Sequence, residues 1–138
     1  MNNKVMPLNN AVINIHNLRL RTYIGFNAEE KEKKQDVIIN IEINYAINNA
    51  VLEDSVDNAL DYKQVTKQVI EHVENGRFLL LEKLVADVLN ICSKNSVVSY
   101  ARVTIDKPHA LRFADSVSLA LEYVSNKTNT LKLVENMS

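Results

Sequence analysis

Apolar and polar residues alternate along several segments of the chain, a pattern typical of half-buried β-strands. The clearest segment is 35–46, where apolar side chains occupy every second position: Val37, Ile39, Ile41, Ile43 and Tyr45. Similar patterns predict strands at 11–25, with a kink, at 97–107 and at 116–124. The alternation therefore predicts two pairs of strands, one pair near each end of the chain.

Between the two strand pairs, apolar residues recur at helical spacing, which predicts two helices. The first begins after Asp61, a good N-cap residue, and ends at Gly76. Its buried stripe is predicted to contain Tyr62, Val65, Val69, His72 and Val73. The second helix follows directly, and its stripe is predicted to contain Leu81, Leu84, Val85, Val88, Leu89 and Cys92.

The predicted order is strand, strand, helix, helix, strand, strand. This order favours an α+β fold in which a four-stranded antiparallel sheet carries both helices on one face. The two open edges of such a sheet can be covered by pairing with copies of the same chain. We therefore expect a single domain at 11–124 in a ring-like homo-oligomer, with a polar lead-in at 1–10 and a tail at 125–138.

Composition and charge narrow the possible functions. The chain has 138 residues, 46% of them apolar, which is enough for one domain with a core. The net charge of -1, without a basic stripe, does not favour a nucleic-acid partner. We see no signal-like segment and no apolar run approaching the roughly 18 residues of a membrane span, so we expect a cytoplasmic protein. Cys92 falls in an apolar helical row and is expected in the core.

Lys107 stands out in the stretch VTIDKPHALRFAD, at 103–115. Strand alternation places it on the same face as Val103 and Ile105, and Pro108 then ends the strand because proline has no amide hydrogen. An ammonium group at the end of a core-facing row is either a side chain that reaches out to water or a working acid/base. The geometry alone favours the first explanation.

Three other polar residues have similarly open explanations. Glu82 follows FLLL at the margin of an apolar stripe, which is consistent with a poorly solvated carboxylate or with an ordinary helix-flank glutamate. Tyr62 fits a core tyrosine at the start of its helix. Glu30 lies in AEEKEKK, where the pattern favours a solvated charged loop.

Motifs for other chemistries are missing from the sequence. The three histidines and single cysteine show no HxH, HExxH or CxxC spacing, so we expect no metal site. Glycine-rich nucleotide loops and the GxSxG nucleophile motif are also absent.

The segments ALDYKQVTKQVIEHVENGRFLLLEKL and YARVTIDKPHALRFADSVSLALEY resemble the dihydroneopterin aldolase family of tunnelling-fold (T-fold) enzymes, a likeness that extends over 12–124. Aldolases of the family usually continue the Lys-Pro pair with a glycine-containing loop, whereas KPHALRFADSVS is similar to the loop of its epimerases. The resemblance implies a pterin substrate and no cofactor. It also implies a homo-octamer of two stacked tetrameric rings, with active sites between subunits.

The resemblance also assigns roles to individual residues. Lys107 matches the acid/base lysine, and Glu30 matches the glutamate that holds that lysine and the substrate hydroxyls. Tyr62 matches a tyrosine contributed across the subunit interface, and Glu82 matches the pterin anchor. We add the hypothesis that His109 and Arg112 face a triphosphate; the alternative is that they pack structurally.

The implied activity is epimerisation at C2′ of 7,8-dihydroneopterin triphosphate, by retro-aldol cleavage and recombination, to 7,8-dihydromonapterin triphosphate. The first alternative is the aldolase of folate biosynthesis, which converts dihydroneopterin to 6-hydroxymethyl-dihydropterin and glycolaldehyde. The second is a non-catalytic pterin-binding ring protein, against which the presence of Lys107 and Tyr62 argues.

Overall fold

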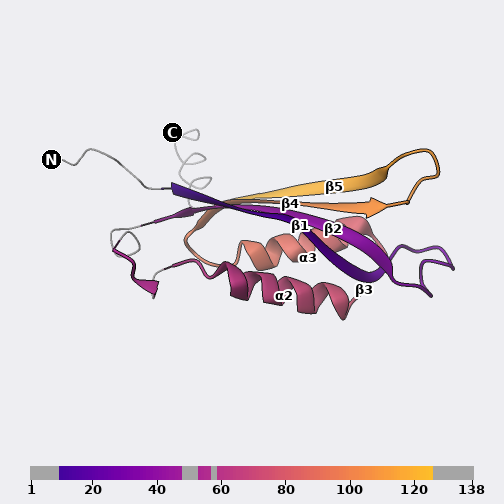
Figure 1. Cartoon of the computed structure of the whole chain (residues 1–138), viewed down its shortest axis with the longest axis horizontal. Coiled ribbons are helices and arrows are strands. Elements are labelled where there is room, and N and C mark those ends of the chain that lie inside the picture. Colours follow the sequence, from indigo (N-terminus) through magenta and orange to yellow (C-terminus); the bar gives the residue numbers. More distant parts are fainter. Residues whose placement is uncertain (1–9, 48–52, 57–58, 126–138) are drawn as a thin grey trace, which may run out of the picture.

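The computed structural model describes residues 10–47, 53–56 and 59–125, in which a long twisted sheet carries two helices on one face (Figure 1). Residues 1–9 and 126–138, and with them nearly all of the predicted lead-in and tail, lie outside the described residues. Within those described ranges, neither helix has the length and apolar character needed to cross a bilayer. The elements are β1 (Asn10–Ile24), β2 (Gln35–Ala46), α2 (Tyr62–Glu74), β3 (Arg77–Phe78), α3 (Leu81–Cys92), β4 (Val98–Pro108) and β5 (Ser116–Val124).

The sheet has five strands in the order β3-β1-β2-β4-β5, and its four long strands pair antiparallel. The predicted α+β class, with both helices on one face, is confirmed. The prediction of four strands is wrong, because β3 adds a fifth strand that pairs parallel with the end of β1. A strand of two residues is too short to leave an alternating pattern, and its partner is distant in the sequence.

The kink predicted in the first strand is a bulge in β1. The register against β2 shifts between Ile15 and Leu18, and Asn17 adopts a positive φ of 53°. The Asn17 amide donates to the side chain of Asn40 at 2.9 Å. Before the bulge, the odd-numbered residues of β1 face the helices, and after it the even-numbered residues do. Ile15 and Leu18 therefore both pack against the core.

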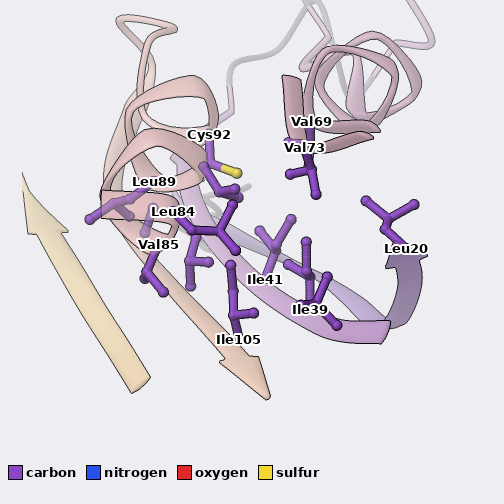
Figure 2. Packing of buried hydrophobic residues seen from close by; sticks show 14 of the residues in the cluster. Leu20, Ile39, Ile41, Val69, Val73, Leu84, Val85, Leu89, Cys92 and Ile105 are labelled. Atoms are coloured by element: carbon purple, nitrogen blue, oxygen red, sulfur yellow. The ribbon is translucent and has the colours of Figure 1, made fainter. Parts of the chain in front are cut away.

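The core lies between the sheet and the two helices (Figure 2). The alternation predicted for β2 and β4 is confirmed, since their core-facing residues are almost fully buried: Val37, Ile39, Ile41, Ile43, Ala101, Val103 and Ile105. The stripe predicted for α3 is also confirmed, because Leu84, Val85, Val88, Leu89 and Cys92 are buried. These rows form the floor of the core, on which α3 packs over β4 and β5 while α2 packs over β1.

The stripe predicted for α2 is wrong at two positions. Val69 and Val73 are buried, but Tyr62 is 50% exposed and the His72 side chain is 43% exposed. His72 points toward α3, where its Nε2 lies 2.7 Å from a carboxylate oxygen of Asp87. The helix packs on the sheet along a narrow seam, so residues at the margins of the apolar arc face solvent or the neighbouring helix.

Hydrogen bonds connect the end of β1 to the last turn of α2 and to the segment that follows it. The buried hydroxyl of Thr22 donates to the Val73 carbonyl at 2.6 Å, and the Gly25 amide donates to the Phe78 carbonyl at 2.9 Å. Gly76 permits this arrangement because a Cβ there would overlap the Phe78 ring. These contacts fix the point at which the chain leaves β1.

Replacing Thr22 with valine tests this connection. The substitution keeps the shape of the side chain but removes a buried donor, so we expect the free energy of unfolding to fall by about 1–2 kcal/mol. Urea unfolding measures the change. The control is Thr66→Val, at a half-buried position of α2 where the hydroxyl donates back to the Tyr62 carbonyl at 2.7 Å. Such bonds within a helix add little stability, so we expect a change within about 0.5 kcal/mol. An equally small effect of Thr22→Val would contradict the proposed connection.

Candidate active site

Lys107 lies at the end of β4, opposite Val117 of β5 and on the core-facing side of the strand. Its side chain is only 13% exposed, and its Nζ lies 3.0 Å from Oε2 of Glu30. The position predicted for Lys107 from strand alternation is confirmed. Its ammonium group binds a carboxylate at the margin of the core and does not extend into solvent. A lysine and a carboxylate within hydrogen-bond distance can exchange a proton with a third group.

Glu30 comes from the connection between β1 and β2, where local hydrogen bonds hold it. Its amide donates to the Asn27 side chain at 2.8 Å, and the Asn27 amide donates back to Oε1 of Glu30 at 3.4 Å. This reciprocal pattern is like that of a helix capping box, but here it closes a turn at residues 28–32. The pattern-based interpretation of Glu30 as a solvated loop residue is therefore wrong. The Asn27-x-x-Glu30 spacing is the signal that points to its fixed position.

Gly25 lets the carboxylate of Glu30 fold back against the backbone. It has a φ of 124°, and a Cβ at this position would overlap the carboxyl group of Glu30. Any other residue would both strain the backbone and displace the carboxylate from Lys107. The glycine that ends β1 therefore determines where the ion pair forms.

The environment of Glu30 favours its ionised form. Burial of the carboxyl group raises its pKa, but hydrogen bonds from Lys107 and from the Asn27 amide, together with the lysine charge, outweigh burial and hold the pKa below its ordinary value of 4.5. Near neutral pH the site therefore holds a carboxylate that is bonded to Lys107.

A small cavity of about 190 Å³ lies beside Glu30. The guanidinium of Arg77 stacks 3.8 Å above the Tyr23 ring in its wall, and the neighbouring Leu79 and Leu80 are more than half exposed. Pockets for small molecules usually enclose about 300–1,000 Å³, so this cavity is smaller than a typical small-molecule site. The lining residues are Tyr23, Gly25, Glu30, Lys31, Arg77, Phe78 and Leu79.

Glu82 lies in the first turn of α3, just after the segment that lines this cavity. It is exposed in the single chain, so the poorly solvated position considered for it from the sequence is wrong there. The N-terminus of a helix stabilises a carboxylate through its exposed amides and partial positive charge. Glu82 is thus an exposed carboxylate three residues after Leu79, which lines the cavity.

Tyr62 lies apart from Lys107 and Glu30 in the same chain. It begins α2, whereas the contacts of Thr22 bring the other end of α2 to the site. The helix has 13 residues and is therefore about 20 Å long. In Figure 1 the start of α2 and the connection from β1 to β2 lie at opposite ends of the domain.

His109 and Arg112 lie in the connection between β4 and β5. His109 directly follows Pro108 and adopts a positive φ of 65°. Arg112 lies further along, with its guanidinium 5.3 Å from the centre of the exposed Phe113 ring. The structure thus brings Lys107, Glu30 and the start of this loop together, and places Tyr62 elsewhere.

The fold agrees with the comparisons to known proteins. The family model for dihydroneopterin aldolase (FolB) matches residues 13–122, and the chain belongs to this family.

Within the family, the chain is 52% identical over 113 residues to the dihydroneopterin triphosphate 2′-epimerase of Escherichia coli K12, covering 82% of this chain and 94% of the relative. It is 49% identical over 111 residues to the enzyme of the same name from Pseudomonas aeruginosa, covering 80% and 90%. The crystal structure of E. coli dihydroneopterin aldolase in complex with neopterin matches with a TM-score of 0.75 and 26% identity, covering 82% of this chain and 98% of the other.

The lowered pKa of Glu30 predicts a pH-dependent contribution to stability. Because the folded state favours the carboxylate, the contribution is present above the unfolded pKa near 4.5 and is lost as the pH falls through the lower folded value. We expect Glu30→Gln to be less stable than the original protein by about 1 kcal/mol at pH 7, with the gap closing in acid. Urea unfolding at pH 7 to 3 measures this gap. The neighbouring Glu29→Gln is the control; a gap for Glu30→Gln that is constant with pH would count against the ion pair.

Proposed function

We propose that this protein epimerises 7,8-dihydroneopterin triphosphate at C2′, producing 7,8-dihydromonapterin triphosphate. The observation that carries the proposal is the Lys107–Glu30 pair, 3.0 Å apart at the end of β4 and beside a small cavity. The identity to proteins named dihydroneopterin triphosphate 2′-epimerase supports the choice of substrate.

In the proposed reaction, Lys107 acts as the neutral amine after its extra proton has passed to water. The amine then takes the proton of the 2′-hydroxyl and becomes an ammonium group, while Glu30 holds the lysine and the side-chain hydroxyls. The C1′–C2′ bond breaks, its electrons pass into the ring imine, and C2′ becomes an aldehyde carbon. The aldehyde then presents its other face, the C1′–C2′ bond forms again, and the proton returns to the oxygen on C2′. The dihydropterin ring serves as the electron sink, so lysine acts by proton transfer and not as a nucleophile.

Glu82 is the proposed pterin anchor. A pterin presents an amino group and a ring N–H side by side, and a carboxylate can accept both in a charge-assisted pair. The exposed position of Glu82 at the N-terminus of α3, next to the cavity-lining Leu79, suits this role.

Tyr62 reaches the site, in this proposal, from a neighbouring subunit of a homo-octamer built from two stacked tetramers. Three features support the arrangement: the small volume of the cavity in one chain, the exposure of Leu79 and Leu80 beside it, and the 50% exposure of Tyr62 at the far end of α2. A second chain can cover the leucines and supply the tyrosine.

An aldolase activity is the second candidate, supported by the structural match to the aldolase bound to neopterin. The two reactions share bond cleavage and differ afterwards. If Tyr62 or water protonates C1′ before the aldehyde recombines, the fragments leave as 6-hydroxymethyl-dihydropterin and an aldehyde. His109 and Arg112 are proposed to hold the triphosphate, which would retain the aldehyde fragment for recombination.

Chromatographic product analysis tests the proposal with dihydroneopterin triphosphate and, separately, with dihydroneopterin. We expect dihydromonapterin triphosphate as the main product. Lys107→Ala should lower kcat about 100-fold or more and leave pterin binding intact. Glu82→Ala should weaken pterin binding about tenfold or more. Mostly 6-hydroxymethyl-dihydropterin would establish the aldolase instead. The absence of any product would indicate a binding protein, and full activity of Lys107→Ala would remove lysine from the mechanism.

Mixed oligomers test whether Tyr62 acts across the interface. Tyr62→Phe is expected to lose most of the 6-hydroxymethyl-dihydropterin product and Lys107→Ala to lose all turnover. Refolding them together creates some sites with both native side chains, so formation of this product should return. The matched control combines Lys107→Ala with Glu30→Gln. Both residues come from one chain, so no mixture restores a complete pair. Recovery in the control but not in the test mixture would contradict the shared site.

A further inference from the structure

A second and larger cavity begins where the proposed catalytic lysine ends its strand. Its volume is about 430 Å³, and Pro108 and His109, which directly follow Lys107, form part of its wall. Its charged lining comes from Arg19 and Arg21 of β1, together with Asp36 and Glu74. Two arginines and a histidine therefore line a space that begins at the residue after Lys107, whose own side chain points to the core side of the sheet.

The sheet register explains why both arginines face this cavity. Arg19 and Arg21 are alternate residues of β1 and are exposed, while Leu20 between them is buried, so they share the face away from the core. Ile38 of β2 lies opposite Arg19 on one side and opposite Asp106 of β4 on the other. The arginines are thus held two strands across from the end of β4.

Existing contacts orient Arg21 and leave some of its donors available. Its NH2 group donates to the Lys34 carbonyl at 2.9 Å, and its Nε lies 3.5 Å from Asp36. A guanidinium has five N–H donors, so further donors remain for an anion. The pair with Asp36 is well exposed, and such pairs are weak, so a multiply charged phosphate can compete with it.

The charge balance of the cavity favours a long anion over a small one. Asp36 and Glu74 offset the two arginines, so a singly charged ion gains little there. A phosphate chain can bridge Arg19 and Arg21 and form bidentate, charge-assisted hydrogen bonds with each.

His109 stands at the mouth of the cavity in an unfavourable backbone conformation. A residue other than glycine with positive φ costs about 1–2 kcal/mol, and such strain is most often kept where it serves a site. The conformation turns the chain immediately after Pro108 and brings the imidazole to the cavity wall.

We propose that Arg19 and Arg21, together with His109, bind the phosphate chain of the substrate and set the preference for phosphorylated over unphosphorylated dihydroneopterin. The inference rests on the proposed function, because the triphosphate is attached to C3′, the neighbour of the carbon on which Lys107 acts. It adds two β1 arginines that a sequence motif did not reveal. The phosphate chain would lie beyond Lys107, away from the pterin edge at Glu82.

Kinetics of the double variant Arg19→Gln/Arg21→Gln on both substrates test the preference. We expect the ratio of kcat/KM for dihydroneopterin triphosphate to kcat/KM for dihydroneopterin to fall about tenfold or more, since each arginine loses charged hydrogen bonds to phosphate. The control Lys94→Gln removes one charge just after the end of α3 and should leave the ratio unchanged. An unchanged ratio in the double variant would overturn the proposal, as would an equal loss on both substrates.

Calorimetry with inorganic tripolyphosphate separates this inference from the proposed reaction. The original oligomer should bind tripolyphosphate, and the double variant should bind it about tenfold or more weakly. If the original protein formed no epimer, the proposed function would fail, yet this binding result would still decide whether the arginines hold phosphate. Equal binding by both proteins, or by neither, would overturn the inference.

Discussion

The ion pair between Lys107 and Glu30 is the contact on which the rest of the site depends. Both groups are mostly withdrawn from water, with 13% and 24% of their side chains exposed. Removing either partner from such a pair leaves an uncompensated charge, which is costly at a desolvated position. Each nearby feature of the fold serves to bring these two groups together from segments that are far apart in the sequence.

Two constraints converge on the pair. The alternation of side chains along β4 places Lys107 at the end of a row of buried residues, because Val103 and Ile105 lie on the same face. From the other side, Gly25 leaves room for the Glu30 carboxylate, and the reciprocal hydrogen bonds with Asn27 hold it there. The strand sets one partner and a local loop motif sets the other.

The sequence predicts the strands and helices that have a periodic pattern of apolar residues. It does not predict features that depend on contacts between distant segments. Alternation in β2 and β4 predicts the core correctly and places Lys107 on the proper face. No sequence pattern predicts the strand β3, because it forms only by pairing with β1. Helical periodicity does not predict the exposure of Tyr62 and His72. It gives the direction of the apolar face of α2 but not the width of the surface that packs against it. Arg19 and Arg21 look like ordinary outward strand residues until the strand order is known, which places the end of β4 two strands away from them.

In the proposed mechanism, different parts of the surface serve different steps. Glu82 and the small cavity hold the pterin, Lys107 with Glu30 cleaves the bond, and the cavity beyond Pro108 holds the phosphates. The epimerase and aldolase reactions share retro-aldol cleavage of the C1′–C2′ bond. Running the reaction in D₂O tests this step most directly. Cleavage and recombination keep the hydrogens on C1′ and C2′, so dihydromonapterin triphosphate formed in D₂O should carry no carbon-bound deuterium, while any 6-hydroxymethyl product should carry one deuterium on its side-chain carbon. Mass spectrometry and NMR of the products give the answer. Deuterium at C2′ of the epimer would show proton abstraction from that carbon and would contradict the mechanism.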